Sequence, residues 1–364
     1  MLSPTHLVAL AYQLGRDPRG AAESAIDAWV REASPRDVVR LGVTARAAFR
    51  HGVWSTYVPL NAPLVPERLA EIAPRAPTSV AALLSTHRSG YVRELALRHL
   101  AAARDAFVIP FLLLRTDDIV PELRALAEGA IEARLEPELA APFARSLAML
   151  ETLGGRTRSG GGPMARRIHR FLAQPACRQA LVAASSDPDP AVRRLASSLR
   201  LHVEPAAHVL APALRDPDTR VRIWAARASV SRSTSDDDKR ALLPILQASR
   251  SACTRSLALR ASQRLDGGDG PLEAALLDHH AAVRYLARTL LRARHPDRAF
   301  GQARTGALAV LATAGAPGPE LVGALGALAD VGLPEDGDAV ARFLADPRPR
   351  VRLEATRTLG FVRR

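Results

Sequence analysis

The stretch Asp187-Pro-Asp-Pro-Ala-Val192-Arg193-Arg-Leu-Ala196 decides the fold, because the chain repeats its pattern. The pattern is an Asp, four residues, an apolar anchor, an Arg, two residues and an Ala. Full copies stand at Asp216/Val221/Arg222/Ala225, Asp278/Val283/Arg284/Ala287 and Asp346/Val351/Arg352/Ala355. Partial copies stand at Val92-Arg93, Leu123-Arg124, Thr254-Arg255 and Ala303-Arg304. Most neighbouring anchors are about 30 residues apart, which predicts an array of helical hairpins.

Each part of the pattern has a role in a helix. An Asp followed by Pro is expected to start a helix, since its carboxylate caps free N–H groups and proline fits the first turn. The anchor and the Ala four residues later fall on one face, and the small Ala lets a neighbouring helix approach closely. Apolar stretches before the copies, such as 209–214, supply the other helix of each hairpin.

The pattern resembles the second helix of a HEAT repeat, especially the short HEAT-like type also seen in phycobilisome-lyase-like proteins. The resemblance covers roughly residues 77–364. It implies an armadillo-like helical α-solenoid, and a ladder between adjacent repeats formed by each Asp and the Arg six residues later. That ladder would comprise Asp187 and Arg193, Asp216 and Arg222, Asp278 and Arg284, and Asp346 and Arg352.

The remaining chain divides around these repeats. Residues 1–76 lack the pattern, although 18–33 and 35–50 have amphipathic helical patterns, so we expect a helical N-terminal cap. A separate binding module remains the alternative for this segment. Residues 77–153 and 164–364 form the repeats. The glycine-rich stretch 154–163 (GGRTRSGGGP) lacks the spacing of phosphate-binding loops and is interpreted as a flexible insert.

Composition indicates which classes of partner and which cellular location to expect. The net charge is +13, from 50 basic and 37 acidic residues, and Lys239 is the sole lysine. A coding bias toward Arg explains Arg over Lys, but not the excess of cations, which favours acidic partners. No stretch predicts a signal peptide or membrane span, so we expect a cytoplasmic protein with no membrane partner. Cys177 and Cys253 are expected to be reduced and buried.

Motifs for chemistry are absent from the sequence. Neither HExxH nor GxSxG occurs, and there is no His-Glu dipeptide such as HEAT-like deoxyhypusine hydroxylases use for iron. HEAT-like alkylpurine glycosylases place a Trp one helical turn before a catalytic Asp. The residues four after Trp29, Trp54 and Trp224 are Ala33, Val58 and Ala228. We therefore predict no catalytic residue, no metal and no cofactor.

A row of arginines is the candidate binding surface. The position six residues after the anchor falls at about 240° on the helix and should face solvent. Arg98, Arg227, Arg260 and Arg357 stand there, while Arg288 and Arg292 occupy the fifth and ninth positions of their copy. Stacked repeats would align these guanidinium groups to bind phosphate or carboxylate. Solubility and helix propensity offer a purely structural alternative.

These observations predict an all-α protein, an α-solenoid of about eight HEAT-like hairpins behind the N-terminal cap. We expect a basic protein-interaction scaffold that binds a protein partner on its concave face, and not an enzyme. The alternative is a nucleic-acid-binding protein whose arginine row contacts the phosphate backbone. A relative of the HEAT-like DNA glycosylases is a weaker third hypothesis.

Overall fold

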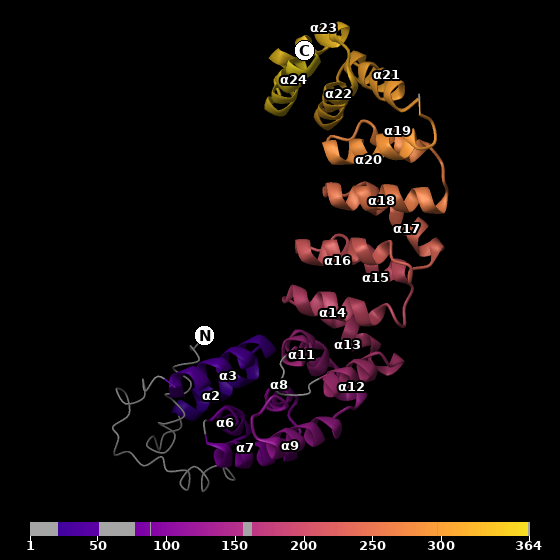
Figure 1. Ribbon diagram of the computed structural model, residues 1–364. Coiled ribbons are helices and arrows are strands. Elements are labelled where there is room, and N and C mark those ends of the chain that lie inside the picture. The colour runs from indigo at the N-terminus through magenta and orange to yellow at the C-terminus, as the bar shows by residue number, and fades with distance from the viewer. Residues whose placement is uncertain (1–20, 51–76, 88, 156–161, 297, 363–364) are drawn as a thin grey trace. The chain divides into compact units, whose positions relative to one another are not determined.

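The computed structural model describes residues 21–50, 77–87, 89–155, 162–296 and 298–362. Within these ranges the chain forms α-helices and short 3-10 helices without any strand, which confirms the all-α class (Figure 1). The chain divides into two compact units, Met1–Glu204 and Pro205–Arg364. Gly154 still belongs to a helix, and another helix begins at Gly162, so the described edges of the predicted insert are helical. Residues 156–161 lie outside the described ranges.

The first unit is built on one continuous core, which runs from Ile26 to Ala196. α6 packs on α7, α8 on α9 and α13 on α14, while α2 packs on α6, and α3 on α8 and α11. Its helices are α2 (Ala21–Glu32), α3 (Pro35–Arg50), α6 (Thr78–Leu84), α7 (Gly90–Ala102), α8 (Ile109–Arg115), α9 (Pro121–Glu132), α10 (Ala140–Arg145), α11 (Leu147–Gly154), α12 (Gly162–Leu172), α13 (Arg178–Ala184) and α14 (Pro190–Arg200).

The predicted helices 18–33 and 35–50 correspond to α2 and α3. Ser34 and Asp37 cap α3 reciprocally: each side chain accepts the backbone N–H of the other residue. These two helices pack into the core of the first unit through the buried side chains of Ile26, Trp29 and Leu41. The rest of the segment 1–76 lies outside the described residues.

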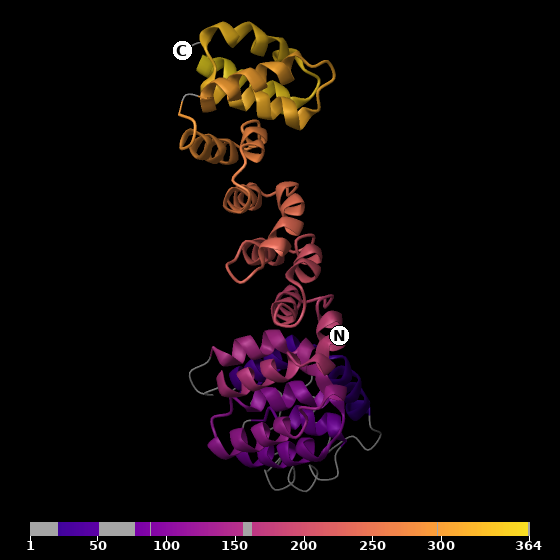
Figure 2. The ribbon, with the colours of Figure 1, turned by 90° about the vertical axis from the view of Figure 1, so that its right-hand side faces the viewer.

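The second unit is a succession of hairpins, each with a first and a second helix. Figure 2 shows the first and second helices of its earlier hairpins as two rows. The second helices α16, α18 and α20 pack one on the next (Figure 1). The helices are α15 (Ala206–Ala213), α16 (Thr219–Ser229), α17 (Asp236–Gln247), α18 (Ala252–Leu265), α19 (Gly270–Ala275), α20 (Ala281–Arg292), α21 (Arg298–Ala312), α22 (Gly318–Val331), α23 (Gly337–Ala341) and α24 (Pro349–Val362).

Small residues at the centres of the repeat helices allow this close stacking. The Ala four residues after each anchor is 0% exposed in seven repeats, at positions 96, 127, 196, 225, 258, 287 and 355. The anchors themselves are also buried. The predicted apolar face of the pattern is thus the face that packs on neighbouring helices. The small side chain of Ala at its centre lets the helix backbones approach closely.

The Asp of the pattern does not cap the helix as the sequence suggested. Asp187 accepts the N–H of Asp189 in the turn before α14, and Asp189 caps the helix by accepting the N–H of Ala191. The same holds before α16, where Asp216 accepts the N–H of Asp218 in the turn and Asp218 caps the helix. The pattern therefore contains a turn-forming Asp, followed in its best copies by a capping residue two positions later.

The side chain of the Arg six residues later donates to the backbone of this turn. Arg193 Nη1 donates to the backbone oxygen of Asp187 at 2.8 Å, although the spacing had suggested a contact with the carboxylate. The same bond, 2.7–3.0 Å long, joins Arg93 to His87, Arg124 to Asp118, Arg222 to Asp216, Arg255 to Ser249, Arg284 to Asp278 and Arg352 to Asp346. Each such Arg therefore closes the turn that leads into its own helix.

The other edge of the guanidinium reaches the next repeat. Nε and Nη2 of Arg93 donate to the two carboxylate oxygens of Asp118 at 2.8 Å. Arg255 binds Asp278 in the same way at 2.7 Å. We call this forked contact the Arg–Asp ladder. Burial alone would raise the pKa of Asp118, but the bonds from Arg93 and the charge of Arg115 outweigh it and lower the pKa.

The ladder takes another form at α22. The partial copy Ala303-Arg304 lies on α21, the first helix of its hairpin, so it does not mark a second helix as expected. The second helix, α22, has no arginine. Its Asp330 instead accepts a hydrogen bond from Nε of Arg284 on α20 at 2.8 Å. A Cβ at Gly326 would lie 2.7 Å from Nη1 of Arg284, and one at Gly323 would overlap the backbone oxygen of Leu277. These two glycines let α22 pack directly on the turn before α20.

We predict that Gly323→Ala destabilises the second unit, since the added methyl group must push α22 away from a backbone oxygen. Overpacking of this kind costs about 3 kcal/mol, or roughly 10 °C in Tm. Thermal unfolding followed by circular dichroism measures it. Gly301→Ala in α21 is the matched control, because nothing lies within 4 Å of its added Cβ. The control should melt at or slightly above the wild-type temperature, and equal melting of both variants would contradict the close packing.

We also predict that Asp278→Asn lowers Tm at pH 7, because Arg255 would lose the carboxylate that balances its buried charge. Removing one partner of a buried ion pair costs about 3 kcal/mol. The pKa of Asp278 is lowered in the folded protein, where the bonds from Arg255 and His280 outweigh burial. Its stabilising contribution is therefore complete above about pH 4 and is lost as the pH falls below the unfolded pKa.

The Tm difference between the two proteins, measured at pH 7, 5 and 3, should accordingly be smallest at pH 3. Asp338→Asn, on an exposed residue without an ion pair among the described residues, is the control and should melt as the wild type does at each pH. A Tm difference for Asp278→Asn that persists unchanged at pH 3 would show that the charge of the ladder is not what stabilises the stack.

Candidate functional site

The second helices of three consecutive hairpins carry only positive charge. α16, α18 and α20 contain nine arginines and no acidic residue. The acidic residues of these hairpins stand in the turns or in the first helices, as Asp236–Asp238 and Glu273 do. Since the three helices pack side by side, they present an extended cationic surface (Figure 1). We call their solvent-facing side the second-helix face.

Four of the nine arginines are engaged in the fold. Arg255, Arg284 and Arg288 bind carboxylates of neighbouring repeats, and Arg222 binds backbone oxygens of its own turn. The other five are exposed and have no acidic partner within the part of the chain that the structure describes; they are Arg220, Arg227, Arg260, Arg264 and Arg292. Arg292 also lies over the ring of Phe300, 5.8 Å from its centroid.

The six arginines of the predicted row have different surroundings. Arg98, Arg227, Arg260 and Arg357 are exposed, as the helical spacing predicted. Arg98 lies in the first unit and donates to Glu94 at 2.8 Å, while Arg357 is 3.8 Å from Glu354. Arg288 is only 13% exposed and binds Asp330 at 2.6 Å.

Of the six, only Arg227, Arg260 and Arg292 lack an acidic partner among the described residues, and all three are on the second-helix face. α22 packs between α20 and α24 and carries no arginine. The cationic row is consequently interrupted before it reaches Arg357 on α24.

Exposed apolar side chains stand beside these arginines. Tyr285 on α20 is 67% exposed and Ile223 on α16 is 36% exposed. Leu353 occupies the same place on α24, two residues after the anchor, and is 55% exposed. Positions two and six after the anchor are about 40° apart on a helix. Helical spacing alone locates these residues, although the predicted binding surface contained arginines only. The second-helix face combines cations with apolar contact area.

A groove opens between the α15–α16 and α17–α18 hairpins, with a volume of about 600 Å³. Its charged lining residues are Arg215, Arg222, Arg250 and Asp216. Ser249, Ser251 and Thr254 add hydroxyl groups, and Ile223 and Ile245 add apolar surface. The groove is therefore cationic on balance and has an apolar wall.

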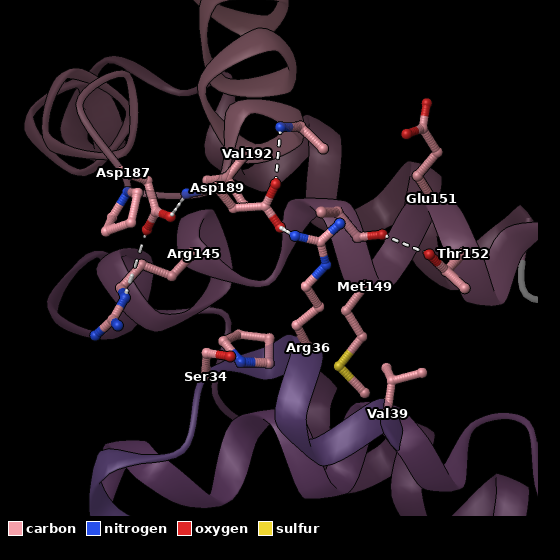
Figure 3. A pocket seen from close by; sticks show the side chains of 14 residues that line it. Ser34, Arg36, Val39, Arg145, Met149, Glu151, Thr152, Asp187, Asp189 and Val192 are labelled. Carbon is pink, nitrogen blue, oxygen red and sulfur yellow. Dashed lines mark hydrogen bonds and ion pairs between the residues drawn. The ribbon is translucent and has the colours of Figure 1, made fainter. Parts of the chain in front are cut away.

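A pocket of about 390 Å³ lies in the first unit, between the start of α3, α11 and the turn before α14 (Figure 3). Arg36 reaches across from α3 and stands 3.5 Å from Asp189, while Arg145 is 3.7 Å from Asp187. Both arginines are mostly exposed. Glu151 also lines the pocket and pairs with Arg194. Every charged group of this pocket thus has a charged or backbone partner.

Both hollows lie at breaks in the Arg–Asp ladder. In the first unit Asp187 is present, but α11, the helix that packs on α14 from the preceding repeat, has no arginine. Arg145 contacts the carboxylate of Asp187 in its place, at 3.7 Å, while Arg36 pairs with the helix cap Asp189. In the second unit Arg222 is present, but Ser249 stands where the next repeat would supply the ladder Asp.

No group of three His, Cys, Asp or Glu side chains in the described ranges is arranged to hold a metal ion. Burial raises the pKa of the Cys177 thiol. Cys253 is exposed, contrary to expectation. Trp29 is buried, Trp224 is half-buried on α16, and Trp54 lies outside the described residues.

None of the helices described is both long and apolar enough to span a bilayer.

Comparison with known proteins adds no relative. No protein-family model matches the chain, and no curated protein matches it significantly in sequence.

Proposed function

We propose that the chain is a binding scaffold, an α-solenoid of HEAT-like hairpins whose second-helix face holds an acidic segment of a protein partner. The observation that carries the proposal is the arrangement of α16, α18 and α20, which expose Arg227, Arg260 and Arg292, without acidic partners in the described ranges, together with Ile223 and Tyr285. Guanidinium groups bind carboxylates in a forked geometry, and the apolar side chains add contact area. We infer a binding function without catalysis.

The charges alone also support a second candidate, a nucleic-acid partner. Three acid-free helices with five exposed arginines would attract a phosphate backbone. Two observations favour the protein partner. Tyr285 and Ile223 offer apolar area that backbone phosphates do not use. The cationic surface is interrupted at α22, which carries no arginine, so a long polyanion that crossed α22 would find no arginine on that helix.

The test is fluorescence anisotropy with three labelled probes: an octapeptide of alternating Glu and Leu, duplex DNA and single-stranded RNA. We expect the wild type to bind the peptide most tightly. Changing Arg227, Arg260 and Arg292 to Gln should raise the peptide Kd about tenfold, as expected for the loss of three exposed ion pairs of roughly 0.5 kcal/mol each.

The control variant removes the same charge from arginines that already have acidic partners, by changing Arg98, Arg240 and Arg357 to Gln. It should bind the peptide as the wild type does. Tighter binding of DNA or RNA than of the peptide, with a salt dependence that weakens in the first variant, would favour the nucleic-acid candidate. An equal loss in both variants would show that net charge, and not the second-helix face, determines binding.

A further inference from the structure

Ser249 occupies the position of a ladder Asp. It stands five residues before the anchor Thr254, as Asp278 stands before Val283. Its hydroxyl accepts the N–H of residue 251 at 3.2 Å, as the carboxylate of Asp278 accepts the N–H of residue 280. Its backbone oxygen accepts Nη1 of Arg255, as the backbone oxygen of Asp278 accepts Nη1 of Arg284. The turn is therefore preserved, and only the carboxylate is missing.

Arg222 closes the turn before its own helix as the ladder arginines do. Its Nη1 donates to the backbone oxygens of Asp216 and Pro217, and Nη2 donates to Thr219. In Arg93 and Arg255, Nε and Nη2 form the edge that binds the next carboxylate. Within the described chain, Arg222 makes no ion pair, and it lines the 600 Å³ groove described above.

The lining of the groove indicates what would fill it. Arg215 and Arg250 add positive charge beside Arg222, and a single acidic residue, Asp216, stands among the lining residues. Ile223 and Ile245 form an apolar wall next to the cations. An acidic side chain with an apolar neighbour matches this combination, because the carboxylate would replace the missing ladder Asp while the neighbour covers the isoleucines.

We propose that this groove binds a Glu or Asp side chain of the partner protein, whose carboxylate pairs with the Nε edge of Arg222 and completes the ladder between the α15–α16 and α17–α18 hairpins. The proposal rests on the proposed function, since it assumes an acidic protein partner, and it assigns one contact of that partner to a defined place. Ile223 lines the groove and also belongs to the second-helix face, so one segment can occupy both.

The test uses the full chain, the alternating Glu/Leu octapeptide and three variants. Ser249→Asp supplies the missing carboxylate from within the chain. It should raise Tm, because Arg222 gains a carboxylate partner in the next hairpin, and it should raise the peptide Kd at least tenfold, because Arg222 is then occupied. Ser249→Asn has nearly the same size and keeps the turn, but it has no charge, so its Kd should equal that of the wild type. Ser233→Asp adds the same charge at an exposed position outside the groove and should also leave the Kd unchanged.

The outcomes separate this inference from the proposed function. Equal Kd values for Ser249→Asp, Ser249→Asn and the wild type would overturn the groove as a carboxylate site. If the Arg227, Arg260 and Arg292 variant still lost the peptide in that case, the second-helix face would stand without the groove. Failure of the wild type to bind the peptide at all, or duplex DNA binding that Ser249→Asp abolishes, would also overturn the inference, and the latter result would assign the groove to phosphate.

Discussion

The fold depends on a guanidinium contact with two halves: the half that closes a turn recurs at seven arginines, and the half that binds a carboxylate of the next repeat is forked at Arg93 and Arg255. One edge of the Arg holds the backbone of the turn that precedes its own helix, and the other edge binds a carboxylate of the next repeat, as Arg255 does with Ser249 and Asp278. The same side chain thus orients a helix and joins it to its neighbour. Lysine has no forked edge and could not make both contacts at once. The contact is complete in some repeats and broken in others, and the groove and the pocket both lie where it is broken.

Much of this was predictable from the sequence. The spacing of Asp, anchor, Arg and Ala located the second helices and their buried face, because a residue pattern that recurs with each hairpin reflects a recurring packing environment. The assignment of the pattern Asp as a helix cap was wrong at Asp187, since the cap is Asp189, two positions later, and spacing does not distinguish the two roles. The position of α22 was not predictable, because its contact with Arg284 uses Gly326 and Asp330, and glycine gives no periodic signal.

The candidate site was predictable only in part. Helical spacing correctly placed Arg227 and Arg260 in solvent, and it also puts Glu94 and Glu354 one turn before Arg98 and Arg357, a signal that the prediction of the row did not use. Spacing could not show that Asp330 stands beside Arg288, because that pair depends on which helices are adjacent. The groove at Ser249 was visible in the sequence as a degenerate copy of the pattern. Its meaning required the atomic contacts of the intact copies, which show what the missing carboxylate would have done.

The two units differ in how their cores are connected. The first unit has one continuous core from Ile26 to Ala196, whereas the buried clusters in the second are smaller, and the one that contains Leu259, Leu272 and Leu291 extends only from α18 to α21. A continuous core opposes separation of any of its helices, while local clusters let adjacent hairpins tilt with little loss of buried area. The second unit is therefore the more elastic part of the chain. Under tension we expect the second unit to extend one hairpin at a time, while the first unit resists extension as a whole.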